Sequence, residues 1–145
     1  MKIFGHPLHI MLIHFPSALF PMELVCYGLY WYTGQPSFGT AAFYTLSGGV
    51  VLGWLATVFG AIDMIKIPQS KPEVLKKALV HGSINVSVVI VYTVFFAKLA
   101  GMYPQIQPPF VSLLVVKCLL VLFMIVGNYI GGSLILKHKL GVENE

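Results

Sequence analysis

Arginine is absent from this sequence, and charged residues of any kind are scarce. Of 145 residues, 10% are charged and 57% are apolar, whereas soluble domains carry roughly 25% charged and about 45–50% apolar residues. A soluble fold of this composition would lack the polar groups to cover its surface, so we expect lipid to be its main solvent. The lack of arginine also argues against a nucleic-acid partner, because phosphate-binding surfaces are usually rich in it.

Cysteine and the usual marks of domain boundaries are nearly absent too. Cys26 and Cys118 both lie in apolar stretches without a CxxC spacing, so we expect buried thiols and no disulfide framework. No small-x-small cleavage site follows the first apolar run, and we therefore expect no cleaved signal peptide. Without repeats, low-complexity tracts or linkers, residues 1–145 are expected to form a single transmembrane domain.

Four long apolar runs make up most of the chain. Each exceeds the length of about 20 residues that a helix needs to cross roughly 30 Å of hydrocarbon. Short breaks containing proline and glutamine separate the runs, and such short loops force neighbouring helices to be antiparallel. The sequence therefore predicts an all-α, integral membrane four-helix bundle, up-down-up-down, with both termini on the same side and spans at about residues 8–32, 39–65, 75–102 and 110–136.

The nine lysines are distributed unevenly between the two ends of such a bundle. We call the membrane face that holds the N-terminus face A and the opposite one face B. Seven lysines fall on face A, namely Lys2, Lys66, Lys71, Lys76, Lys77, Lys137 and Lys139. By the positive-inside rule, face A and both termini are expected to be cytoplasmic.

The histidines are expected to gather at face A as well. The topology brings six side chains to that end, namely His6, His9, His14, Asp63, His81 and His138. Ionisable residues in membrane spans are candidates for function by default. His14 and His81 each lie about two turns inside a span and thus at similar depth, so we expect them to bind a haem iron or a transition-metal ion. His6 and His138 are equally well explained as interfacial residues.

Several residues extend this expected site. His9 and His138 lie nearer the headgroups and are candidates for a second iron or for hydrogen bonds to the first site, and Asp63 for a ligand of a smaller metal ion. Asn85 follows His81 by one helical turn and is expected to hydrogen-bond to its imidazole. His9 and His14 are about 140° apart around a helix and should not bind one ion together. The lysines expected to receive haem propionates are Lys76, Lys77 and Lys137.

Two further patterns lie deeper in the spans. Glu23 and Lys117 match in depth, and an unpaired charge there would cost at least a few kcal/mol. We therefore expect a buried ion pair, with half of a proton path as the alternative. Gly49 and Gly53, like Gly127 and Gly131, have the GxxxG spacing of closely packed membrane helices. Such glycines would equally leave a flat slot for a planar cofactor, and spacing alone does not separate the two.

The two ends of the sequence carry a family resemblance. The run GHPLHIMLIHFP at residues 5–16 resembles HPLHPxLVHFP, which opens members of the DUF2231 family of prokaryotic membrane proteins. GGSLILKHKLGV at residues 131–142 is similar to the family's closing GGxLVYxHGVGV. Ile10 and Lys139 depart from the proline and glycine that are usual there. The resemblance implies a prokaryotic inner membrane, and relatives joined to Rieske iron–sulfur or c-type cytochrome domains imply membrane electron transfer.

We accordingly expect a membrane electron-transfer protein, or a subunit of a redox complex, that binds haem b through histidines at face A. Its partners would be a quinone or an iron–sulfur or cytochrome protein, and it would be an electron carrier rather than a stand-alone enzyme. One alternative is a permease for a metal ion or protons that uses the same histidines with Asp63. Another is a structural subunit of a larger membrane complex, and the sequence leaves open whether the chain forms homo-oligomers.

Overall fold

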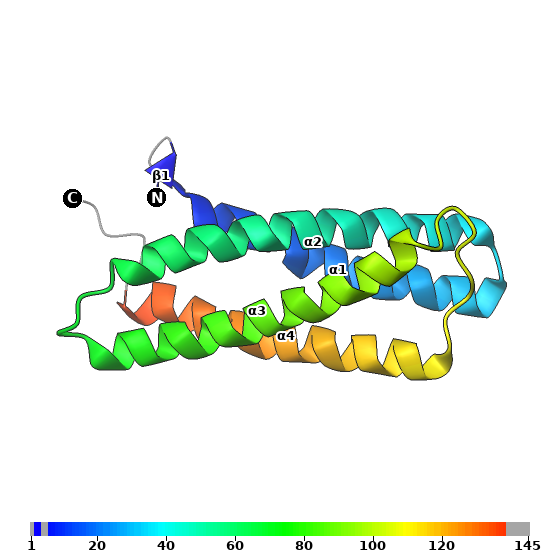
Figure 1. Ribbon diagram of the computed structural model, residues 1–145. Helices are drawn as coiled ribbons and strands as arrows, with labels where there is room; N and C mark the ends of the chain where they lie inside the picture. The colour runs from blue at the N-terminus through cyan, green and yellow to red at the C-terminus, as the bar shows by residue number, and fades with distance from the viewer. Residues whose placement is uncertain (1, 4–5, 139–145) are drawn as a thin grey trace.

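Four long helices run side by side along the whole molecule (Figure 1). The structure, a computed structural model, describes the backbone at residues 2–3 and 6–138 and the side chains at residues 8–137. A short antiparallel pairing of β1 (Lys2–Ile3) with β2 (His6–Pro7) precedes the first helix. The helices are α1 (Leu8–Thr33), α2 (Pro36–Ile65), α3 (Pro72–Ala100) and α4 (Val111–His138).

All four helices are long and apolar enough to cross a membrane, which confirms the predicted spans to within three residues at either end. Their boundaries follow from local sequence. Pro36 and Pro72 stand at the first helical positions of α2 and α3, where a missing N–H is harmless and a fixed φ is favourable. Gly34 follows α1 with a φ of 68°, a conformation that suits glycine at the end of a helix.

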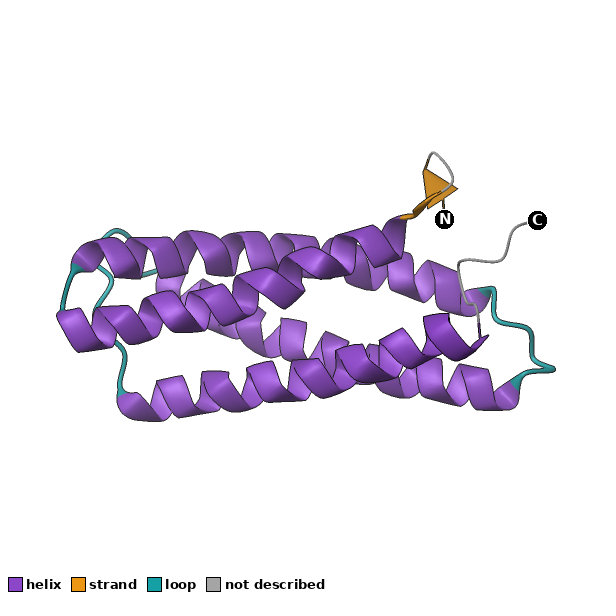
Figure 2. Ribbon diagram, turned by 180° about the vertical axis from the view of Figure 1, so that it is seen from behind, coloured by secondary structure: helices purple, strands orange, loops and turns teal. Residues whose placement is uncertain are grey.

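The chain follows an up-down-up-down course (Figures 1 and 2). The start of α1, the end of α4 and the loop at residues 66–71 share one end of the bundle, which is face A. Each of α1 and α3 packs against both α2 and α4, so α1 and α3 lie diagonally opposite one another. The predicted topology is confirmed, and the diagonal helices are those that carry His9, His14 and His81.

A block of large side chains fills the middle of the bundle. The rings of Phe20 and Tyr92 stack with centroids 3.9 Å apart, and both side chains are fully buried. Beside them, the Lys117 ammonium lies 2.6 Å from a Glu23 carboxylate oxygen, with 1% and 0% of these residues exposed. The predicted ion pair is therefore confirmed. Gly49 gives room to the Phe20 ring, so this glycine serves helix packing.

Candidate functional site

A cavity of about 870 Å³ occupies the half of the bundle between this block and face A. All four helices line it, and Phe20 lies at its inner end. Most of the wall is apolar, while His9, Asp63, Lys66 and His81 supply ionisable groups. Ligand sites in proteins typically measure roughly 300–1,000 Å³ and combine apolar walls with a few polar groups. Its volume and lining therefore make this cavity the main candidate site.

His9 enters the cavity from α1 and is held by α2. Its Nδ1–H donates to the carbonyl oxygen of Ala56 over 2.8 Å. The ring lies directly over Gly60, where an added Cβ would come within 2.7 Å of the His9 Cε1 atom. Only glycine leaves space for the imidazole at that position, so Ala56 and Gly60 together fix where the ring lies.

His81 enters from α3 and is held by α4 in the same way. Its Nδ1–H donates to the carbonyl oxygen of Gly127 over 2.7 Å. The ring lies over Gly131, where an added Cβ would come within 2.5 Å of His81 Cε1. Asn85 lies beside this imidazole, with its amide nitrogen 3.2 Å from His81 Nδ1 and 3.0 Å from the His81 carbonyl oxygen.

The two histidine sites are equivalent halves of one arrangement. In each half, one helix supplies an imidazole, and the next helix supplies a carbonyl and, four residues later, a glycine. The two rings are neighbours in the cavity, with centroids 6.3 Å apart and planes 76° apart. Because Nδ1 of each ring is bonded to a carbonyl, that bond selects the tautomer and leaves Nε2 as the ligating nitrogen. The pair can therefore offer two Nε2 atoms to one ligand between them.

These donors suit a haem better than a bare metal ion. Imidazoles that bind one metal from opposite sides, at about 2 Å each, have ring centres roughly 6 Å apart. Among the side chains at residues 8–137, His9 and His81 are not joined by a third histidine, cysteine or carboxylate in a metal-binding group. A structural zinc ion takes four such ligands. A haem supplies four nitrogen ligands itself and would need only the imidazoles of His9 and His81.

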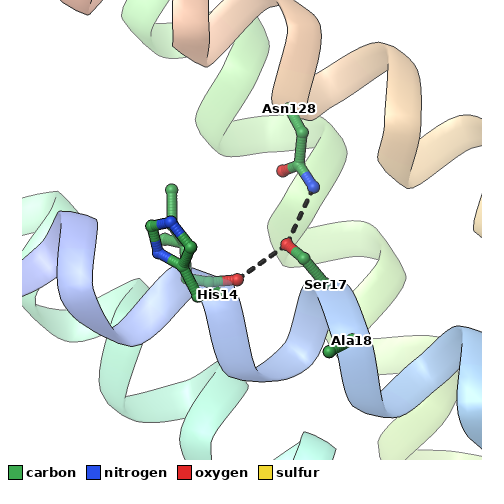
Figure 3. A pocket seen from close by; sticks show the side chains of 5 residues that line it. His14, Ser17, Ala18 and Asn128 are labelled. Carbon is green, nitrogen blue, oxygen red and sulfur yellow. Dashed lines mark hydrogen bonds between the residues drawn. The ribbon is translucent and has the colours of Figure 1, made fainter.

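The sequence predicts that His14 lies together with His81, but the structure does not bring these two side chains together. The His14 side chain is exposed on the outer side of α1, and its Nδ1–H donates to the Ile10 carbonyl oxygen within its own helix. It lines a separate, smaller pocket with Ser17 and Asn128 (Figure 3). The reason is rotational, since residues five apart face different sides of a helix and only one of His9 and His14 can point inward.

The other predicted residues divide between the cavity and the surface. Asp63 lines the cavity, and a carboxylate oxygen lies 3.4 Å from the Lys66 ammonium. Lys66 is thus the lysine of the cavity wall, whereas Lys76, Lys77 and Lys137 do not line it. The side chains of His6 and His138 lie outside the described residues, so their predicted roles stay predictions.

The inward position of His9 had a signal in the sequence. A helix turns by about 100° per residue, so His9 lies about 40° around α1 from Glu23, and His14 about 180° from it. Glu23 must face the interior to be paired, which places His9 inside and His14 outside. The spacing of Ala56 and Gly60 matches that of Gly127 and Gly131, and this match was the missed indication of the glycine under His9.

Comparison with known proteins identifies the family of the chain but does not indicate a ligand or a reaction. The family described as "predicted membrane protein (DUF2231)" matches residues 5–144. No curated protein and no solved structure matches the chain. This match confirms the family resemblance of the two ends of the sequence.

Proposed function

Since the chain belongs to the DUF2231 family of predicted membrane proteins, we propose that it is a membrane electron-transfer protein or redox-complex subunit that binds haem b between His9 and His81. The observation that carries this proposal is the pair of neighbouring imidazoles, with centroids 6.3 Å apart and each bonded through Nδ1 to a carbonyl of the neighbouring helix. A bound haem would supply reversible one-electron chemistry, which no side chain of the cavity provides.

The chain's own residues orient and enclose this group. The Ala56 and Gly127 carbonyls hold the two rings and make them better ligands, because an accepted Nδ1–H raises the basicity of the other nitrogen. Phe20 closes the inner end of the cavity and keeps out water from the side of face B. Lys66, at the end of α2, is placed to pair with a propionate.

The packing of the bundle favours this proposal over a permease. A transported ion would have to pass the stacked rings of Phe20 and Tyr92, both fully buried, and then the paired charges of Glu23 and Lys117. A transition-metal ion as resident ligand would need further donors, such as the Asp63 carboxylate or water. A purely structural subunit would have no use for two imidazoles turned into a cavity.

We further propose an inner-membrane location with face A in the cytoplasm, based on the distribution of the lysines. The site would then exchange electrons near the cytoplasmic face. Its partners would be a membrane quinone or an iron–sulfur or cytochrome protein, either as separate molecules or as subunits of one complex.

The visible spectrum of the purified protein, expressed with haem supplied, tests the proposal. Reduction with dithionite should give a low-spin ferrous b-type spectrum. His9→Ala and His81→Ala should each abolish this spectrum or convert it to high spin, because each removes one of the two imidazoles that would hold the iron. His14→Ala is the matched control and should leave it unchanged. A colourless wild-type protein, or a spectrum that is sensitive to His14 alone, would contradict the proposal.

A further inference from the structure

A second pocket of about 330 Å³ lies on the outer side of the seam between α1 and α4 (Figure 3). It is lined by Ile13, His14, Ser17, Ala18 and Asn128. At about 1.5 Å per residue, His14 lies roughly 9 Å below the start of α1, and Asn128 roughly 15 Å below the end of α4. This pocket opens sideways toward lipid, at a depth below the headgroups.

Its polar groups are arranged to receive a ligand. The His14 Nδ1–H donates to Ile10, which leaves Nε2 as an acceptor. Asn128 donates one amide hydrogen to the Ser17 hydroxyl over 2.9 Å, and this hydroxyl donates to the Ile13 carbonyl over 2.7 Å. Figure 3 shows the His14 ring and the Asn128 amide on two sides of the same opening.

Several polar atoms of this pocket have no hydrogen-bond partner among the described residues. Among the described residues, neither Nε2 of His14 nor the carbonyl oxygen and second amide hydrogen of Asn128 forms a hydrogen bond. Polar groups that face hydrocarbon without a partner are expensive. A ligand that fits must therefore be apolar enough to travel in lipid and must carry oxygen atoms that can donate and accept.

The pocket also shares a wall with the histidine cavity. Ile13, Ser17 and Asn128 line both spaces, so a single layer of side chains separates them. A ligand in the outer pocket would lie next to whatever His9 and His81 hold.

We propose that this outer pocket binds the head group of a lipid-soluble quinol. A quinol hydroxyl would donate to Nε2 of His14, and the Asn128 amide would donate to an oxygen of the ring. The isoprenoid tail would lie along the exposed apolar surface of α1 and α4. This inference rests on the proposed function, because a quinol is a redox partner that moves within the membrane.

The proposal is tested with a photoreactive azido-benzoquinol that carries a decyl tail and is kept reduced under argon. The probe is added to the purified protein in lipid nanodiscs, and the labelled peptides are mapped by mass spectrometry. We expect saturable labelling of residues 10–18 or 124–131, and decylubiquinol should displace the probe. Labelling on other helices, or labelling that decylubiquinol does not displace, would overturn the proposal.

Matched variants make the assignment specific. His14→Leu and Asn128→Leu should each weaken probe binding by about tenfold, the usual effect of one lost hydrogen bond that leaves its partner unpaired. His14→Gln should recover part of the loss, because its amide restores an acceptor. Tyr129→Leu is the control, since Tyr129 is 80% exposed beside Asn128 and does not line the pocket. Circular dichroism confirms that each variant is folded.

Two further outcomes separate this proposal from its rivals. His81→Ala should remove the haem spectrum and leave labelling intact, so a failure of haem binding is distinguished from a failure of quinol binding. If His14→Leu instead dissociates a dimer of the chain and does not affect labelling, the polar groups form a contact between two copies, and the quinol site is refuted.

Discussion

A methyl group at Gly131 would collide with the ring on which the histidine site depends. An added Cβ would lie 2.5 Å from Cε1 and 2.7 Å from Nδ1 of His81, where carbon contacts normally measure about 3.5–4.0 Å. The ring would have to move by about 1 Å, away from the Gly127 carbonyl that now accepts its proton over 2.7 Å. Overpacking of this kind typically costs about 1–3 kcal/mol.

Gly132→Ala is the control for this experiment, because a Cβ there meets no atom within 4 Å. Both substitutions replace glycine by alanine in α4 and gain the same helix propensity of about 1 kcal/mol. The difference between the two variants therefore isolates the collision. We expect Gly131→Ala to be less stable than Gly132→Ala by about 1–3 kcal/mol, measured by SDS-induced unfolding in detergent followed by circular dichroism. If the two unfolding curves coincide, the imidazole does not lie on Gly131.

Three other predictions test the rest of the bundle. Lys117→Met should destabilise the bundle by about 3–5 kcal/mol in the same unfolding assay, because it leaves the Glu23 charge buried without a counter-charge. Adding Glu23→Gln should restore part of the loss, and additive losses would refute the pairing. Tyr30→Phe should cost about 1–2 kcal/mol, since it leaves the buried Ile106 carbonyl without its 2.7 Å hydrogen bond, whereas Tyr32→Phe, at an 81% exposed position, should be neutral. A reporter enzyme fused to the C-terminal end should be active in the cytoplasm; activity on the other side would reverse the proposed orientation.

The sequence predicted the helices and one buried contact because each depends on a single coordinate. Length and hydropathy along the chain suffice to define spans, since every residue of a span meets the same thickness of hydrocarbon. Depth alone also paired Glu23 with Lys117, because in the middle of a bundle a charge has almost nowhere else to find its counter-charge.

The histidine pair could not be predicted from depth, because it depends on rotation about the helix axis. His9 and His14 differ by little more than one turn in depth but point to different sides of α1. The stripe of buried α1 residues Pro16, Phe20 and Glu23 fixes this rotation, and it is recognisable only once the ion pair is accepted. The carbonyls of Ala56 and Gly127 leave no trace in the sequence, because every residue has one.

The ion pair in the middle of the bundle also bears on how a membrane voltage acts on the protein. A single charge that crosses a full 100 mV changes in energy by about 2.3 kcal/mol. Glu23 and Lys117 carry opposite charges 2.6 Å apart, so a field across the bundle exerts almost no net force on the pair. A variant that keeps only one of the two charges would lose that cancellation.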